Sequence, residues 1–252
     1  MQQLLEEAGY EIVPFEPGAD VYLINTCTVT NIADRKSRQM LHKAKKMNPD
    51  AIVIAAGCYV QTDEGKLDKD EAVDLILGNN QKGNIVQVLE EYEQQHTRQK
   101  HVIKINQTKE YEELAIDHTA EHVRAYIKVQ DGCNQFCTYC IIPYARGRVR
   151  SRKIAHVMDE VRALAAKGYK EVVLTGIHLS SYGVDFPAEE KETLLSLIRA
   201  VHEVEGIERI RLVPWNRESS QKNLCRALPH CRKCVRISIC PCRADVIPHW
   251  SE

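Results

Sequence analysis

Short apolar runs alternate with amphipathic stretches through residues 1–95. Three runs, at 21–25, 51–55 and 73–77, end at a small or polar residue, as buried strands do. Apolar residues recur at helical spacing over 32–47, where Asn31 is expected to cap the helix, and again over 85–92. Strand, helix and strand in this order predict a parallel sheet with helices on its faces.

A second alternation follows a polar stretch of little periodicity. It predicts strands at 123–129, 171–175 and 209–212 and helices at 155–167 and 193–204, the first of these helices ending at Gly168. Repeated strand and helix in this order open a β/α barrel. A closed eightfold barrel takes roughly 200 residues or more, so we expect the barrel to be incomplete where the pattern stops.

The pattern stops at Leu212. Residues 213–252 hold seven Lys and Arg against three Asp and Glu, both tryptophans and five of the ten cysteines. The Cys231-x2-Cys234 spacing would suit a zinc module, and a divergent barrel is another alternative. We interpret the tail as out of frame, because nothing in it supplies the further strand and helix units that a barrel requires.

These patterns predict an α/β protein with two domains. Residues 1–95 form a parallel α/β domain, 96–121 a linker, 122–212 a partial barrel and 213–252 the atypical tail. A chain of 252 residues is long enough for two domains that each bury a core.

Composition narrows the class of protein. Lys and Arg number 34 against 35 Asp and Glu, so there is no global positive field to attract nucleic acid, and DNA is not an expected partner. No run approaches the roughly 18 apolar residues of a membrane helix, and the start lacks the features of a signal peptide. We therefore expect a cytoplasmic chain without a membrane partner, in which ten cysteines indicate metal or redox chemistry.

Cys133, Cys137 and Cys140 form a C-x3-C-x2-C loop directly after a predicted strand. Three thiolates at this spacing can hold three irons of a [4Fe-4S] cluster and leave the fourth iron open. S-adenosylmethionine bound at the open iron can be cleaved to a 5′-deoxyadenosyl radical. A zinc loop or a ferredoxin-like carrier is the alternative, but either would need a fourth ligand nearby, and residues 141–212 contain no cysteine.

The sequence around these cysteines resembles the cluster loop of the radical-SAM methylthiotransferase family. The resemblance covers residues 131–147 and implies that Tyr139 lies near the adenine of S-adenosylmethionine, with ordinary loop packing as its alternative role. It also implies that Thr175 and Gly176, after the next strand, offer backbone to the amino group of the same cofactor.

The Thr-Gly-Ile-His wording at 175–178 is similar to the branch that acts on N6-threonylcarbamoyladenosine in tRNA. The isopentenyladenosine branch typically carries Gly-Gln-Asn at this place. His178 on its own is weak evidence, because a lone histidine at a strand end is more often a hydrogen-bonded structural group than a catalyst.

Cys27 and Cys58 end two predicted parallel strands, at the edge of the sheet where ligands converge. From the residues alone, ordinary free cysteines are the more common interpretation. The family resemblance implies that they help to hold an auxiliary [4Fe-4S] cluster, which the family binds through three cysteines. The family's first cysteine has no counterpart here, so we expect the chain to begin after that element.

A basic stretch follows the cysteine loop. It consists of Arg146, Arg148, Arg150, Arg152 and Lys153. These residues could meet RNA phosphates near the substrate base, and a solvated basic loop is the alternative.

By resemblance, the function is methylthiolation of C2 of an adenosine beside the tRNA anticodon. One S-adenosylmethionine would supply the radical and another the methyl group, and sulfur would pass through the auxiliary cluster. The base must be splayed out of its stack to reach the site. Besides tRNA, the expected partners are a flavodoxin or ferredoxin type of reductant and a sulfur donor.

Three alternatives remain from the sequence. The substrate could be isopentenyladenosine tRNA or a ribosomal protein, or the chain could be an inactive, purely iron–sulfur or zinc-binding fragment. No residue is assigned as a catalytic acid or base.

Overall fold

The computed structural model describes residues 1–113, 124–187, 189–190, 192–213 and 234–236. The chain divides into two compact units. The first comprises Met1–Leu114 with Gly132–Arg148, and the second comprises Ala115–Asp131 with Val149–Glu252. The cysteine loop therefore groups with the first unit, while the domain boundaries drawn from the sequence remain a prediction.

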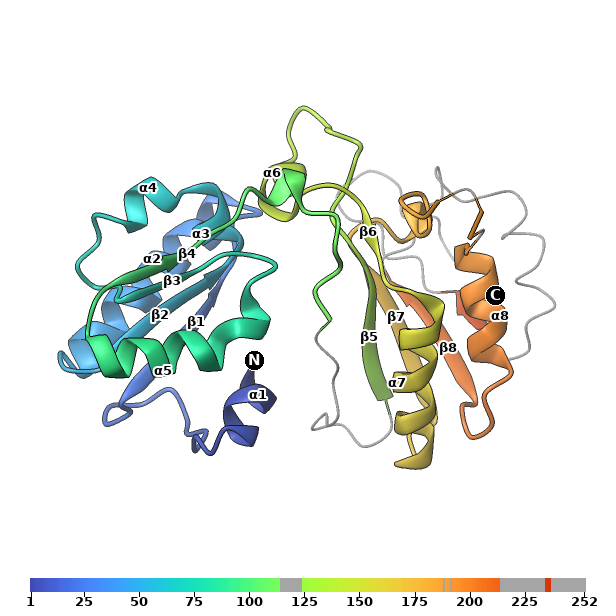
Figure 1. Cartoon of the computed structure of the whole chain (residues 1–252), viewed down its shortest axis with the longest axis horizontal. Coiled ribbons are helices and arrows are strands. Elements are labelled where there is room, and N and C mark those ends of the chain that lie inside the picture. The colour runs from blue at the N-terminus through green and yellow to red at the C-terminus, as the bar shows by residue number, and fades with distance from the viewer. Residues whose placement is uncertain (114–123, 188, 191, 214–233, 237–252) are drawn as a thin grey trace, which may run out of the picture. The chain divides into compact units, whose positions relative to one another are not determined.

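The first unit is built on a four-stranded parallel sheet (Figure 1). Its strands lie in chain order: β1 (Val21–Thr26), β2 (Ile52–Gly57), β3 (Leu75–Leu77) and β4 (Gln99–His101). The register pairs Thr26 with Gly57, so β1 and β2 end side by side. The three buried strands predicted for this region are confirmed, as is the α/β class.

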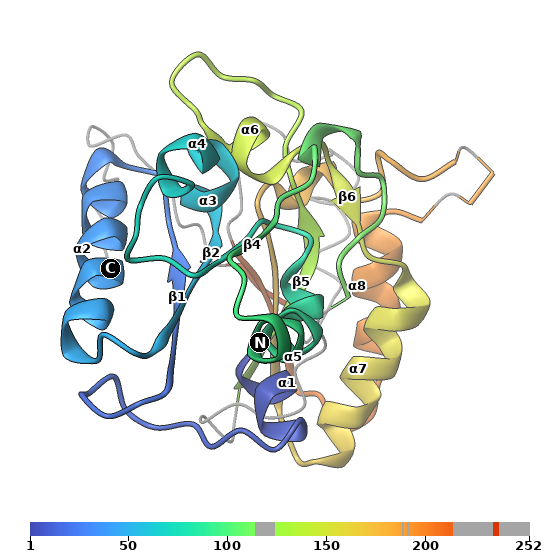
Figure 2. The same cartoon turned by 60° about the vertical axis from the view of Figure 1, so that its left-hand side comes forward.

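Helices cover both faces of this sheet (Figure 2). One face packs on α2 (Asn31–Met47) through Leu41 and Ala44. The other face packs on α1 (Gln2–Glu7) and α5 (Ile85–Gln95). Short helices complete the unit: α3 (Cys58–Thr62), α4 (Glu64–Leu67), η1 (Lys82–Asn84), η2 (Ile105–Gln107) and α6 (Ile142–Arg146).

The predicted cap of α2 is wrong by one residue. Thr30 has an extended backbone and its hydroxyl accepts from the amide of Ala33, whereas Asn31 is the first helical residue. Threonine fills this place because its hydroxyl satisfies one of the free amides of the first turn.

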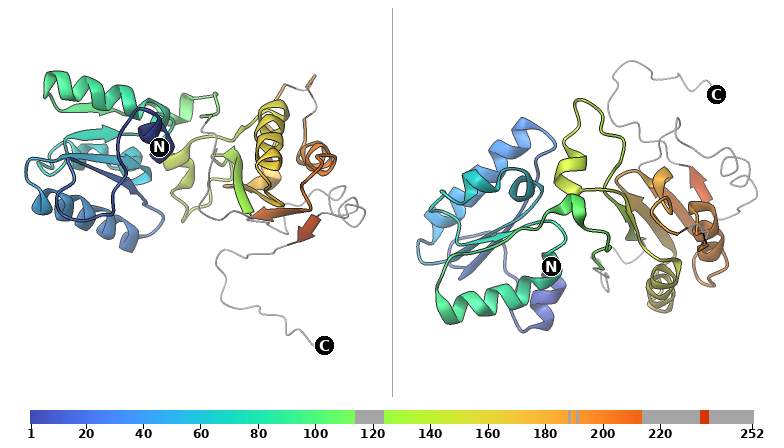
Figure 3. Two further views of the ribbon diagram at one scale, coloured as in Figure 1. Left: turned by 90° about the horizontal axis from the view of Figure 1, so that it is seen from below. Right: turned by 45° about the horizontal axis from the view of Figure 1, so that its top comes forward.

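The second unit is a five-stranded sheet with the order β6-β5-β7-β8-β9. Its strands are β5 (Arg124–Asp131), β6 (Arg150–Ser151), β7 (Glu171–Gly176), β8 (Arg209–Val213) and β9 (Cys234–Arg236). All pairs are parallel except β5 with β6. Helices α7 (Ile154–Ala166) and α8 (Leu194–His202) pack on one face, and η3 (Leu179–Ser181) follows β7 (Figure 3).

Three strands differ from the sequence expectations. β6 lies in the basic stretch, where no strand was predicted, and pairs antiparallel with β5. β4 lies within the predicted linker 96–121, where Gln99, Lys100 and His101 carry no apolar signal and the strand forms by pairing with β3. β9 pairs with β8 inside the tail, where no barrel strand was expected. The rest of the tail, and with it the reading-frame and zinc interpretations, lies outside the described residues.

The amino-terminal end of the second sheet is held by a charge cluster. Glu171, with its side chain 5% exposed, accepts hydrogen bonds from Arg209 at 3.0 Å and from Arg211, and it forms an ion pair with Arg124 at 2.6 Å. Burial acts to raise the pKa of Glu171, but the arginines outweigh it and hold the pKa below its ordinary value. The cluster therefore stabilises the ionised carboxylate.

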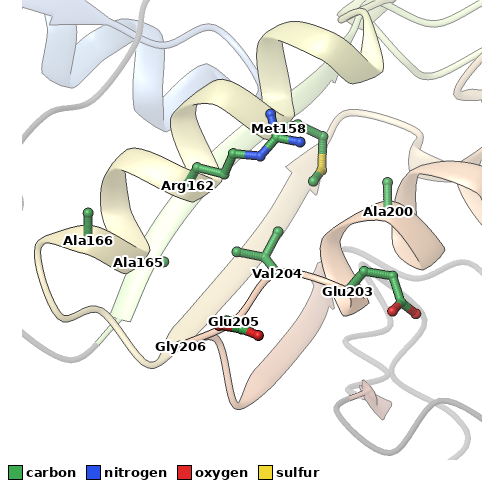
Figure 4. Close-up of a pocket in the computed structure, with 9 residues that line it drawn as sticks. All are labelled: Met158, Arg162, Ala165, Ala166, Ala200, Glu203, Val204, Glu205 and Gly206. Atoms are coloured by element: carbon green, nitrogen blue, oxygen red, sulfur yellow. The ribbon is translucent and has the colours of Figure 1, made fainter.

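A groove of about 530 Å³ runs between α7 and α8 near this end of the unit (Figure 4). It is lined by Met158, Arg162, Ala165, Ala166, Ala200, Glu203, Val204, Glu205 and Gly206. Ligands of parallel α/β sheets bind beyond the carboxyl ends of the strands, so this groove is apart from the expected site. Among the helices described, none has the length and apolar character needed to cross a membrane.

Candidate functional site

The cysteine loop is closed at a neck formed by Gly132, Cys133, Gly147 and Arg148. The amide of Cys133 donates to the carbonyl of Gly147 at 3.0 Å. Gly132 has φ +71°, and a Cβ there would lie 1.9 Å from the Arg148 carbonyl oxygen. Only glycine fits this close approach, so the chain enters and leaves the loop at one fixed point.

The three thiols of the loop differ in exposure. Cys133 is buried, Cys140 is half-buried and Cys137 is exposed, and the amide of Cys140 donates to the carbonyl of Cys137 at 2.9 Å. Burial raises the pKa of Cys133, and the nearby Cys140 and Cys137 raise it further. A bound cation would relieve both effects, because metal ligation stabilises the thiolate.

The donor set fits an iron–sulfur cluster. Among the described residues, no three His, Cys, Asp or Glu side chains converge closely enough to hold a single metal ion. A cubane does not require such convergence, because each thiolate binds a different iron. Three thiols on one loop, with one of them buried, match that arrangement.

Aromatic and basic side chains surround the loop. Phe136 meets Tyr144 edge to face at 5.8 Å between ring centroids, and the Arg148 guanidinium lies 4.4 Å from the Phe136 centroid. Tyr139 is 88% exposed. The loop-packing alternative for Tyr139 is therefore not what the structure shows, and its role beside S-adenosylmethionine remains a prediction.

Cys27 and Cys58 are placed side by side at the carboxyl edge of the first sheet. Each follows one member of the paired residues Thr26 and Gly57. The Ser37 hydroxyl accepts from the amide of Cys27 at 3.2 Å and donates to its carbonyl at 3.3 Å. Cys27 is exposed, and Cys58 is buried. The predicted edge position of both cysteines thus agrees with the register of β1 and β2.

The Cys58 sulfur accepts hydrogen bonds from two side chains that sequence reasoning did not assign to it. Arg146 donates from Nε at 3.0 Å, and Asn79 donates from Nδ2 at 3.6 Å. Asn79 also donates to the carbonyl of Ala145 at 2.6 Å. Asn79 comes soon after the end of β3, so a search of the residues just beyond each parallel strand could have found it.

The basic stretch does not form one exposed surface. Arg146 is directed to Cys58, and Arg148 is exposed. Arg150 is 1% exposed and lies 3.7 Å from Asp131, and Arg152 is buried in an ion pair with Glu160. A phosphate cannot reach the buried Arg150 in this structure. The prediction of an RNA contact therefore depends mainly on Arg148, while Lys153 is partly exposed in an ion pair with Glu190.

Thr175 and Gly176 end β7 in the second unit. The Thr175 hydroxyl lies 3.4 Å from the Ile127 carbonyl. The Gln130 side chain packs against Gly176 and accepts from the amide of His178 at 2.8 Å. Burial lowers the pKa of His178, whose Nδ1 is 2.6 Å from the Ser181 hydroxyl. This histidine is thus a hydrogen-bonded group, as its ordinary role at a strand end predicts.

Comparison with family models matches two regions of the chain. Residues 1–78 match "Uncharacterized protein family UPF0004", and residues 127–235 match the "Radical SAM superfamily". Among solved structures, the radical S-adenosylmethionine methyltransferase TsrM from Kitasatospora setae superposes with a TM-score of 0.54 at 17% identity. That likeness covers 92% of this chain and 49% of the other, and it shows the fold alone.

Curated relatives are more informative. Threonylcarbamoyladenosine tRNA methylthiotransferase MtaB from Aquifex aeolicus is 45% identical over 88% of this chain and 53% of its own length. The protein of the same name from Bacillus subtilis is 42% identical over 83% of this chain and 46% of its own.

A Clostridium botulinum tRNA-2-methylthio-N(6)-dimethylallyladenosine synthase is 33% identical over 94% of this chain and 53% of its own length. The chain spans about half the length of the relatives it matches. The two matched domain families and the relatives at 42–45% identity show that the chain belongs to the radical-SAM tRNA methylthiotransferase family.

Proposed function

We propose that the protein methylthiolates C2 of N6-threonylcarbamoyladenosine next to the tRNA anticodon. The observation that carries the proposal is the closed loop that holds Cys133, Cys137 and Cys140 on one short segment. The choice of base is supported by identity, which is 42–45% to relatives named for threonylcarbamoyladenosine and 33% to the C. botulinum relative named for dimethylallyladenosine.

The proposal assigns the cysteines to two clusters. Cys133, Cys137 and Cys140 hold the radical-SAM [4Fe-4S] cluster, and Cys27 and Cys58 supply two ligands of an auxiliary [4Fe-4S] cluster. Tyr139, Thr175 and Gly176 are assigned to S-adenosylmethionine. When bound, the reduced cluster and S-adenosylmethionine supply the radical that removes hydrogen from the base.

The chain's own residues position the cysteine ligands and shield part of the site from water. The neck at Gly132 and Gly147 fixes where Cys133 stands, and the burial of Cys133 keeps water from one corner of the site. Arg146 donates to the Cys58 sulfur and offsets negative charge there.

The partners follow from the chemistry. The target atom lies on a base edge, so the tRNA must present an unstacked adenosine, and Arg148 is the exposed cation beside the loop that would meet its phosphates. A flavodoxin or ferredoxin type of protein would supply electrons, and a separate donor the sulfur. The proposed location is the cytoplasm, where tRNA is modified.

The test is to reconstitute the protein with iron and sulfide without oxygen, reduce it, and measure 5′-deoxyadenosine formed from S-adenosylmethionine. We expect formation that is lost in Cys137→Ala. Wild-type formation no greater than in that variant would contradict radical chemistry and favour the fragment interpretation.

The substrate is then tested by mass spectrometry of nucleosides from tRNA incubated with the enzyme. We expect the 2-methylthio form of N6-threonylcarbamoyladenosine. Methylthiolation of isopentenyladenosine alone, or of a ribosomal protein alone, would contradict the proposed substrate while leaving the radical chemistry intact.

A further inference from the structure

Asn79 connects two parts of the first unit that are far apart in the sequence. Its Nδ2 donates both to the Cys58 sulfur at 3.6 Å and to the Ala145 carbonyl at 2.6 Å. Ala145 lies in α6, within the loop that carries the other three cysteines. One amide group thus contacts the end of β2 and the main chain of the cysteine loop.

Arg146 also connects the cysteine loop to Cys58. It is the last residue of α6, and its Nε donates to the Cys58 sulfur at 3.0 Å. Helix α6 also packs directly on α3, which begins at Cys58. Cys58, Asn79 and Arg146 therefore form one hydrogen-bonded cluster, which we name the Cys58 link.

The buried side-chain amide of Asn79 cannot be explained by its contribution to stability. Asn79 is 2% exposed, and among the described residues its Oδ1 has no donor. A buried acceptor without a partner costs free energy that a leucine of similar size would not cost. The two contacts made by Nδ2 are therefore the structural reason for an amide at this position.

We propose that Asn79 and Arg146 are positioning residues that dock the radical-SAM cysteine loop on the sheet edge carrying Cys58. The two cysteine sites are then built as one assembly, and the loop keeps its place before iron is bound. The inference deepens the proposed function, on which it rests for the meaning of the two sites. The docking contacts are hydrogen bonds between protein groups, so they can be tested on the metal-free chain.

Hydrogen exchange of the metal-free full chain tests the docking. The reporters are the amides of Tyr144, Ala145 and Gly147, which donate within the loop. We expect Asn79→Leu to raise their exchange about tenfold, since it removes both Nδ2 bonds. The matched control is Asn84→Leu. Asn84 is exposed, and its side-chain amide donates to the neighbouring Gln81 side chain at 3.2 Å.

Exchange of the β2 peptide, Ile52–Gly57, shows in the same sample whether the sheet remains folded. Arg146→Leu is a second variant outside the sheet, with an increase of about tenfold or less expected for one lost charge-assisted bond. If loop exchange in both variants stays within about twofold of wild type while β2 stays protected, the docking role is refuted.

Alkylation of the free thiols provides an independent readout. Cys27 is exposed and serves as an internal standard, whereas Cys58 is 4% exposed. Release of the loop in Asn79→Leu should speed labelling of Cys58 relative to Cys27, and an unchanged ratio would contradict the proposal. Both readouts precede iron binding, so a wild-type protein that forms no 5′-deoxyadenosine overturns the proposed function and leaves the docking intact.

Discussion

The two cysteine sites of the first unit use the same local device but are assembled in different ways. In each, a buried cysteine follows a glycine with positive φ: Gly132 before Cys133 and Gly57 before Cys58. A Cβ on Gly57 would lie 2.6 Å from the Thr26 carbonyl oxygen, as one on Gly132 would meet Arg148. In both sites the glycine allows another backbone segment to approach closely just before the cysteine.

The difference lies in where the partners come from. The loop draws its three cysteines from one short segment, so their spacing can be recognised in the sequence. The sheet edge draws Cys27 and Cys58 from neighbouring parallel strands and then adds Asn79 and Arg146. A local site depends on its own turn geometry, whereas an assembled site depends on the packing of the whole unit.

Loss of a single cysteine gives the largest expected effect and separates the two sites. Cys137→Ala should lower 5′-deoxyadenosine formation by more than about 100-fold, because removing a ligand exceeds the 10–100-fold typical of its supporting groups. Cys27→Ala should leave formation close to wild type and abolish methylthio transfer to tRNA. Equal loss of 5′-deoxyadenosine in both variants would remove the distinction between the sites.

The shared glycine step is tested by adding one methyl group. Gly132→Ala and Gly57→Ala should each lower the free energy of unfolding by about 3 kcal/mol, from positive φ and backbone overlap together. Gly9→Ala is the control, since Gly9 has φ +93° and nothing within 4 Å of an added Cβ.

The control variant should lose only about 1 kcal/mol. Urea unfolding followed by circular dichroism measures all three. A loss at Gly132 or Gly57 no greater than that at Gly9 would show that the close approach to backbone is unimportant.

Glu171 lies far along the chain from both cysteine sites, so its replacement should affect stability and leave the chemistry unchanged. Glu171→Gln should lower the free energy of unfolding by about 2 kcal/mol at pH 7, because three arginines lose their carboxylate. 5′-Deoxyadenosine formation per folded molecule should not change.

The pH dependence of this loss follows from the lowered pKa of Glu171. The folded state binds its proton less tightly than the unfolded state, so the carboxylate stabilises the fold above the ordinary glutamate pKa of about 4.3. That stability disappears as pH falls through the folded-state pKa, and wild type and variant should then converge. Glu208→Gln, at an exposed pair with Lys170, is the control and should stay within about 0.5 kcal/mol at every pH.

The smallest effect on stability is expected at Tyr139. Since its side chain is 88% exposed, Tyr139→Ala should change the free energy of unfolding by less than about 0.5 kcal/mol. If its ring packs on S-adenosylmethionine, the variant should weaken cofactor binding by about fivefold, and Tyr139→Phe should retain it. Equilibrium dialysis with the reconstituted protein measures both, and unchanged binding in Tyr139→Ala would end this assignment.

Much of the fold follows from local patterns. The strand predicted at 171–175 is observed as Glu171–Gly176, and the helix predicted at 155–167 as Ile154–Ala166. The helix carries the apolar period of a helix that packs on one face, and the strand is a short continuous apolar run that is buried on both faces. The three-cysteine loop was recognisable for a similar reason, because its ligands share one segment.

The features that the sequence did not reveal depend on contacts between distant residues. β4 is polar and becomes a strand only by pairing with β3. Arg146 was expected at an RNA surface, and its contact with Cys58 follows from the packing of α6 on α3. Asn79 carries no motif at all, since its role arises where the ends of β2 and β3 meet the cysteine loop.

The closed neck of the cysteine loop affects how a lost cluster can be replaced. Its glycine contacts and the Cys133–Gly147 hydrogen bond involve only backbone, so no bond to a metal is needed to form them. We therefore expect cluster insertion to order little additional chain, whereas a zinc finger folds only when its metal binds. A cluster destroyed by oxygen should accordingly be replaceable on the same folded molecule, which makes the protein repairable.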